Sequence, residues 1–115
     1  MPIVGYRWFE ISAAGCAVLG KRPESSVIQD YLGWQDATIE LPDDPQAGVE
    51  MIRHLLADTE RMAAIHRRNY RENLLRNDWR HRFKAMFEHL GLPVPTKLKE
   101  QLDQLYQRSE TNCPG

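Results

Sequence analysis

Three residues near the start of the chain have the types and spacing to bind a ligand. Gly5, Arg7 and Glu10 lie at the beginning of a stretch with helical spacing that runs to about residue 14. A carboxylate accepts hydrogen bonds from hydroxyl groups, an arginine can hold a phosphate bidentately, and a glycine lets a phosphate approach the backbone. Considered alone, Glu10 is more simply interpreted as a surface glutamate in the first turns of a helix, where the helix dipole favours it.

The elements around Glu10 predict an α/β fold. Tyr6, Phe9 and Ala13 share one helix face, and Gly15 suits the left-handed position just after a helix end. The apolar run 16–19 predicts a buried strand, residues 37–41 a second strand, and residues 2–4 the end of a third. Strands that alternate with helices imply a short parallel sheet of two to three strands, with ligands bound beyond the carboxyl ends of the strands.

The remainder of the chain predicts further helices. One begins near Pro23 and ends at Gly33, another follows Asp44 and Pro45, and a third follows Asp58 and runs to about residue 76. The strongest amphipathic pattern then predicts a helix with one buried stripe, whose members are Trp79, Phe83, Met86, Phe87 and Leu90. A last helix begins at Thr96.

The first helix and the strand after it resemble a known family. Arg7, Phe9, Glu10, Gly15 and the apolar run 16–19 are similar to the motif of the group 1 glycosyltransferases. This family has the GT-B fold of two Rossmann-like domains, and the resemblance extends to about residue 90. It implies that residues 1–91 form a Rossmann-like half-domain that binds the nucleotide-diphosphate sugar donor. The sequence pattern itself predicts a C-terminal helix over 92–110 and a disordered tail over 111–115.

The resemblance also implies roles for single residues. Glu10 would be the catalytic residue and contact the donor sugar, while Arg7 and Gly5 would contact its diphosphate. Many relatives carry a second glutamate eight residues after the first, which binds the ribose, but this chain has Val18 there. Glu24, in the loop after the first predicted strand, could replace that contact, although a plain helix-start residue is the simpler interpretation.

The resemblance covers only the donor-binding half, so we expect glycosyl transfer to need an acceptor-binding domain and the chain alone to be inactive. The acceptor stays unknown. A sheet with uncovered edges predicts that the chain forms homo-oligomers or packs against a missing N-terminal domain. No cofactor or metal is predicted, because the four histidines lack metal-ligand spacing. With neither a leader peptide nor a membrane-spanning run, and with two unpaired cysteines, we expect a cytoplasmic protein.

Charge patterning leaves other functions open. Residues 61–115 carry eleven basic and six acidic side chains, and the basic ones cluster between Arg67 and Lys84 with aromatic residues between them. A helical adaptor for nucleic acid or protein is therefore an alternative function, although a solvated basic face is the simpler explanation and nucleic acid is not the favoured partner. A pseudo-domain that only dimerises is a third possibility.

Overall fold

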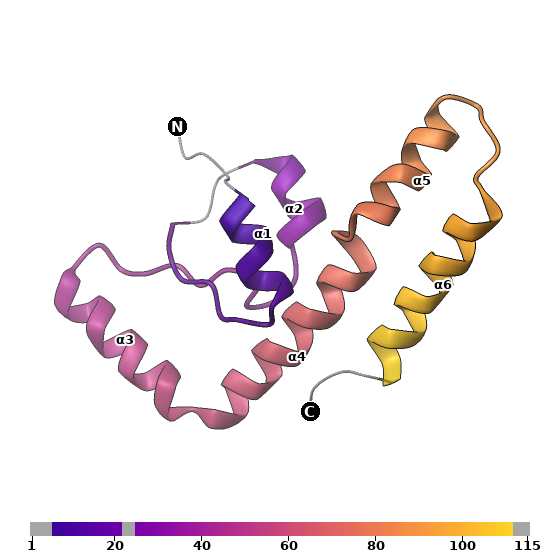
Figure 1. The fold of residues 1–115 in the computed structure, drawn as a ribbon. Coiled ribbons are helices and arrows are strands. Elements are labelled where there is room, and N and C mark those ends of the chain that lie inside the picture. Colours follow the sequence, from indigo (N-terminus) through magenta and orange to yellow (C-terminus); the bar gives the residue numbers. More distant parts are fainter. Residues whose placement is uncertain (1–5, 22–24, 112–115) are drawn as a thin grey trace.

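The computed structural model describes residues 6–21 and 25–111 as an arrangement of helices (Figure 1). Six helices follow one another along these residues, namely α1 (Tyr6–Ala13), α2 (Ser26–Leu32), α3 (Pro45–Ala57), α4 (Thr59–Arg76), α5 (Trp79–His89) and α6 (Thr96–Thr111). All six were predicted, with small differences at their ends. The predicted strand over residues 2–4 and most of the predicted tail lie outside the described residues.

The starts of α3 and α4 are set by local side-chain caps. Asp44 caps α3 by accepting a hydrogen bond from the backbone N–H of Ala47 (3.1 Å). Asp58 caps α4 in the same way through the N–H of Arg61 (3.0 Å). Such caps satisfy the free N–H groups of a first turn, which is why these starts are readable from sequence.

The predicted parallel sheet is wrong, and with it the Rossmann-like α/β fold class. The described residues contain no strand, and segments 16–19 and 37–41 meet only in one isolated parallel bridge between Leu19 and Ile39. Ile39 donates to the carbonyl of Val18 (2.8 Å) and accepts from the N–H of Gly20 (3.0 Å).

The pairing does not continue to the preceding residues because their ladder groups have other partners. The carbonyl of Cys16 accepts from Asn69 of α4 (2.8 Å), and the N–H of Ala37 donates to the carbonyl of Trp34 (3.1 Å). Two hydrogen bonds are too few to make an independent sheet.

Two small apolar clusters stabilise the N-terminal half, one between α1 and α2 and one between α3 and α4. The first joins buried Ile28, Leu32, Trp34 and Ala37 to the half-buried Trp8, Phe9 and Tyr31. The second joins buried Ile39, Leu55 and Ile65 to Ala17, Leu19, Met51 and Met62. Both clusters lie on the N-terminal side of the molecule, so α1 is packed firmly on one side while its other side is left open.

A row of amides on α4, the asparagine ladder (Asn69, Asn73, Asn77), connects these parts. Asn69 accepts from the indole N–H of Trp34 (2.8 Å), while the amide nitrogen of Asn73 donates to the hydroxyl of Ser12 (2.8 Å). Asn77, which follows the helix end, donates to the carbonyl of Tyr31 (2.8 Å). The ladder therefore fixes α1, α2 and the loop around residue 34 on a single helix.

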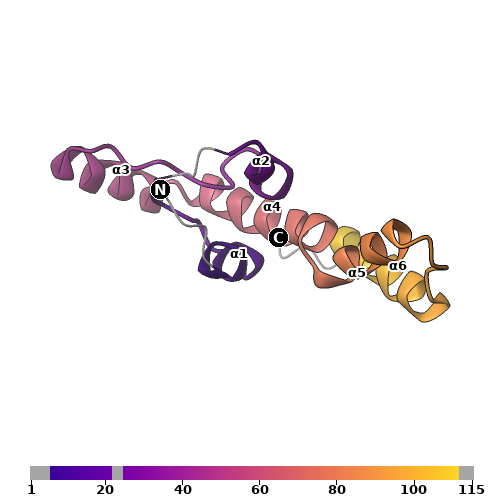
Figure 2. The ribbon, with the colours of Figure 1, turned by 90° about the horizontal axis from the view of Figure 1, so that it is seen from above.

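The C-terminal helices extend away from this core. Figure 1 shows α5 continuing the line of α4 and α6 running back beside both, and α6 buries Leu102, Leu105 and Ser109. The predicted buried stripe of α5 is wrong, because this helix has no buried residue and four of the five predicted members are exposed. Figure 2 shows the resulting thin molecule, which measures 54 × 36 × 17 Å.

Candidate functional site

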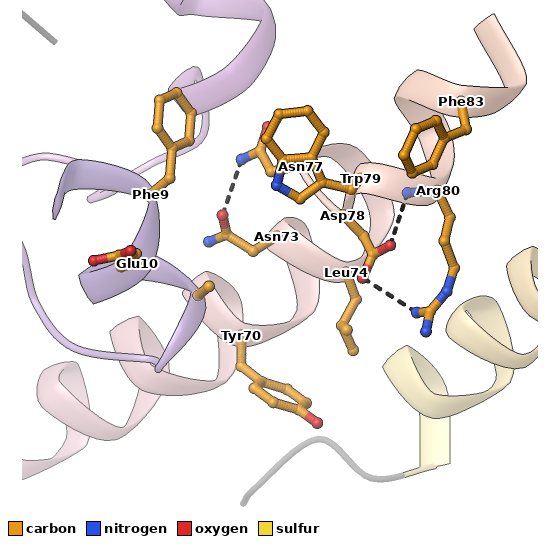
Figure 3. Close-up of a pocket in the computed structure, with 11 residues that line it drawn as sticks. Phe9, Glu10, Tyr70, Asn73, Leu74, Asn77, Asp78, Trp79, Arg80 and Phe83 are labelled. Carbon is orange, nitrogen blue, oxygen red and sulfur yellow. Dashed lines mark hydrogen bonds and ion pairs between the residues drawn. The ribbon is translucent and has the colours of Figure 1, made fainter. Parts of the chain in front are cut away.

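A hollow of about 500 Å³ lies between α1, α4 and α5, and we call it the α1–α5 pocket (Figure 3). Its volume is within the range of about 300–1,000 Å³ that is typical of small-molecule sites. The eleven lining residues are Phe9, Glu10, Ala13, Tyr70, Asn73, Leu74, Asn77, Asp78, Trp79, Arg80 and Phe83. The predicted site residue Glu10 is thus part of its wall.

The packing of α1 leaves Glu10 at the edge of this hollow. Ser12 is fully buried against α4, and Phe9 packs edge-to-face on Tyr31 with ring centroids 6.3 Å apart. These contacts fix the rotation of the helix about its own axis. Glu10 and Ala13, which are three residues apart and share a face, are left at the open side of the helix.

The pocket has two carboxylates with different environments. Asp78 caps α5 through the N–H of Arg80 (3.0 Å) and also pairs with the guanidinium of Arg80 (3.4 Å). Glu10 is exposed, and within residues 6–21 and 25–111 its carboxylate has no hydrogen bond or ion pair. Glu10 is therefore the carboxylate of this pocket that is available to a ligand.

Of the other predicted site residues, only Arg7 is described by the structure. Arg7 is exposed on α1, one turn before Glu10, and is not among the lining residues. Gly5 and Glu24 lie outside the described residues. Of the two predicted site residues that the structure describes, Arg7 and Glu10, only Glu10 lines the pocket.

Sequence reasoning missed the aromatic and amide wall of the pocket. Trp79 and Phe83 were assigned to a core, and the asparagine ladder was not recognised, because polar residues along a charged helix read as solvent-facing. The signal that could have found the ladder is the spacing of Asn69, Asn73 and Asn77 by four residues, which puts three amides on one helix face.

Three of the seven basic side chains between Arg67 and Lys84 form ion pairs within the chain. Arg76 pairs with Glu72 (2.8 Å), Arg80 with Asp78 (3.4 Å) and Lys84 with Glu88 (3.7 Å). Arg82 lies over the ring of Tyr31, 4.5 Å from its centroid. This pairing reduces the charge that a nucleic-acid backbone would meet, and it weighs against the adaptor alternative.

Further features of the described residues limit the chemistry that can be assigned. In this part of the chain no three His, Cys, Asp or Glu side chains gather where they could hold a metal ion. None of its helices combines the length and the apolar character that crossing a bilayer requires. A second hollow of about 460 Å³, between α3, α4 and the loop around Cys16, is lined mainly by apolar side chains.

Comparison with known proteins identifies the family. Residues 2–88 match the family model described as glycosyl transferase-like, which is more than half of the 115 residues. No curated protein and no solved structure matches the chain significantly. The matched range includes the predicted motif around Glu10 and every residue that lines the α1–α5 pocket. The chain therefore belongs to the glycosyl transferase-like family, as its resemblance to the group 1 glycosyltransferases predicted.

Proposed function

We propose that this chain binds a nucleotide-diphosphate sugar as the donor-binding part of a glycosyltransferase, with the sugar at Glu10. The observation that carries the proposal is the uncommitted carboxylate of Glu10 in a pocket made entirely of family-matched residues. Asp78, the other carboxylate of the pocket, is engaged by Arg80 and is less able to accept new hydrogen bonds.

The chemistry of a carboxylate fits a sugar. Glu10 can accept hydrogen bonds from two adjacent hydroxyl groups, and such charge-assisted bonds are stronger than neutral ones. During glycosyl transfer the bond from the anomeric carbon to the diphosphate breaks, and positive charge develops on the sugar ring. A nearby carboxylate stabilises that charge, so Glu10 would serve both binding and catalysis.

In this proposal Arg7 contacts the diphosphate. It lies one turn before Glu10 on the same exposed side of α1, so its long side chain can reach a diphosphate held next to the sugar at Glu10. The acceptor would be bound by a different part of the enzyme, and transfer would require both parts together.

A titration of the ¹⁵N-labelled chain with UDP-glucose and GDP-mannose tests the donor-binding role. Binding at the α1–α5 pocket is expected to shift the amide signals of α1 and of the α4–α5 junction, while the signals of α3 stay in place. Shifts confined to α3 and α6, or no shifts with either donor at millimolar concentration, would refute the proposal.

A further inference from the structure

The exposed rings at the start of α5 need an explanation. Trp79 is 62% exposed and Phe83 is 48% exposed, although their spacing was predicted to bury them. Both rings belong to the wall of the α1–α5 pocket, opposite α1 (Figure 3). Exposed aromatic rings beside a hollow are a common feature of ligand sites.

The two rings are held as a pair. Their centroids are 6.5 Å apart, with the planes inclined by 39°. The guanidinium of Arg82 lies 5.8 Å from the centroid of Trp79 and also covers Tyr31 of α2, which packs against the first apolar cluster. Arg82 thereby links Trp79 to the core of the molecule, so this exposed ring has a supported position rather than a free one.

The polar groups next to the rings are already in use. Asn73 donates to Ser12 and to the carbonyl of Asn69, and it accepts from Asn77. Asn77 in turn directs its amide N–H groups to Tyr31 and Asn73. The side-chain carbonyl oxygen of Asn77, Oδ1, has no hydrogen-bond partner among the described residues, but it is buried and therefore not open to a ligand at the surface. This wall therefore offers flat apolar faces and few free hydrogen-bonding groups.

We infer that Trp79 and Phe83 form a stacking platform for the nucleobase of the donor. The inference rests on the proposed function, which places the sugar of the donor at Glu10. It adds a binding position for the nucleobase, at the opposite end of the same ligand and on the opposite wall of the pocket. Since every base has a flat π face and the neighbouring polar groups are committed, the platform supplies affinity without selecting one base. Uracil, guanine and adenine nucleotides are all expected to use it.

This inference is tested by measuring the affinities of ligands that contain a nucleobase and of one ligand that lacks it. Trp79→Ala is expected to weaken UDP, GDP and ADP by roughly 5- to 150-fold, the range that stacking on one aromatic side chain provides. Inorganic pyrophosphate, which has no base, should bind wild type and variant equally. Trp79→Phe keeps a ring and should retain most of the nucleotide affinity.

Val49→Ala is the control, because Val49 is an exposed apolar residue of α3 that does not line the pocket. It should leave all affinities unchanged. The platform is refuted if wild type binds UDP and Trp79→Ala binds it equally well, if pyrophosphate is weakened equally, or if only UDP-glucose is weakened, which would place the sugar on the rings. Absence of nucleotide binding by wild type would instead refute the proposed function on which the platform depends.

Discussion

Gly15 occupies a position that no other residue fits. Its φ is +83°, in the left-handed region, and a Cβ built there would collide with the imidazole ring of His66. His66 also bonds through Nδ1 to the carbonyl of Gly15 (3.0 Å), which ties the end of α1 to α4. Gly91 has a similar φ of +68° but has nothing within 4 Å of such a Cβ.

These two glycines give a matched pair of variants. Gly91→Ala is expected to lower the free energy of unfolding by about 1–2 kcal/mol, the cost of the left-handed conformation alone. Gly15→Ala should cost more, because His66 must also move and lose its hydrogen bond. Urea denaturation of both variants checks this order, and an equal loss would show that His66 is not packed as described.

Asn69 provides the second prediction at this scale. It is fully buried and serves both the indole N–H of Trp34 and the carbonyl of Cys16. Asn69→Ala leaves these two groups without their partner and is expected to lower the free energy of unfolding by about 2–4 kcal/mol. Arg71→Ala, at an exposed position of the same helix, should change it little. Equal denaturation midpoints for the two variants would contradict the structural role of the ladder.

The helices were predictable from sequence, whereas the contacts between them were not. Asp44, Pro45 and Asp58 signal helix starts because capping involves only residues a few positions apart. The segments 16–19 and 37–41 also had the composition of strands, but strand formation depends on partners that are distant in sequence. Here Asn69 of α4 binds the carbonyl group of Cys16, and local composition carries no information about that competition.

An ion pair joins two loops, and its contribution to the stability of the fold depends on pH. Lys21, after the bridge, pairs with Asp43, before α3, at 2.8 Å. The hydrogen bond and charge of Lys21 lower the pKa of Asp43, and Asp43 raises the pKa of Lys21. The pair therefore stabilises the fold above the ordinary aspartate pKa of about 3.9, and its contribution disappears as the pH falls through the lowered value.

Because both side chains are exposed, the effect is expected to be small and sensitive to salt. The difference in melting temperature between wild type and Lys21→Ala should be present at pH 7 in low salt and absent at pH 2. A difference that persists at pH 2 would mean that Lys21 acts through packing rather than charge.

The molecule as a whole is thin for its length. Its radius of gyration is 16.5 Å, whereas a compact chain of this size is expected to have about 13 Å. A thin molecule has little interior, which explains why α5 exposes the residues that its sequence pattern predicted to be buried. The pattern indicated correctly that one face of α5 is apolar, but it could not tell a core from a surface.

This shape leads us to expect self-association through the far end of α5. Met86, Leu90 and Leu92 are each at least half exposed and lie beyond the α1–α5 pocket. Burying them between two copies would stabilise a dimer by removing apolar surface from water. Sedimentation should show concentration-dependent mass for wild type and a monomer for Leu90→Glu. A wild-type monomer up to high micromolar concentration would contradict this expectation.

Glu10 is the central residue of the proposed donor site, because it was predicted from the sequence and lines the α1–α5 pocket. Glu10→Gln is nearly isosteric at an exposed site, so folding should be unchanged. Glu60→Gln is its control, because Glu60 is exposed on α4 and does not line the pocket.

The most direct test compares the affinities of wild type, Glu10→Gln and Glu60→Gln for UDP-glucose and for UDP. Loss of a charge-assisted hydrogen bond is expected to weaken the binding of UDP-glucose by about 1.5–3 kcal/mol in Glu10→Gln only. The affinity for UDP should be the same in all three proteins. If wild type binds UDP-glucose and Glu10→Gln binds it equally well, Glu10 does not hold the sugar and the assignment of the site is wrong.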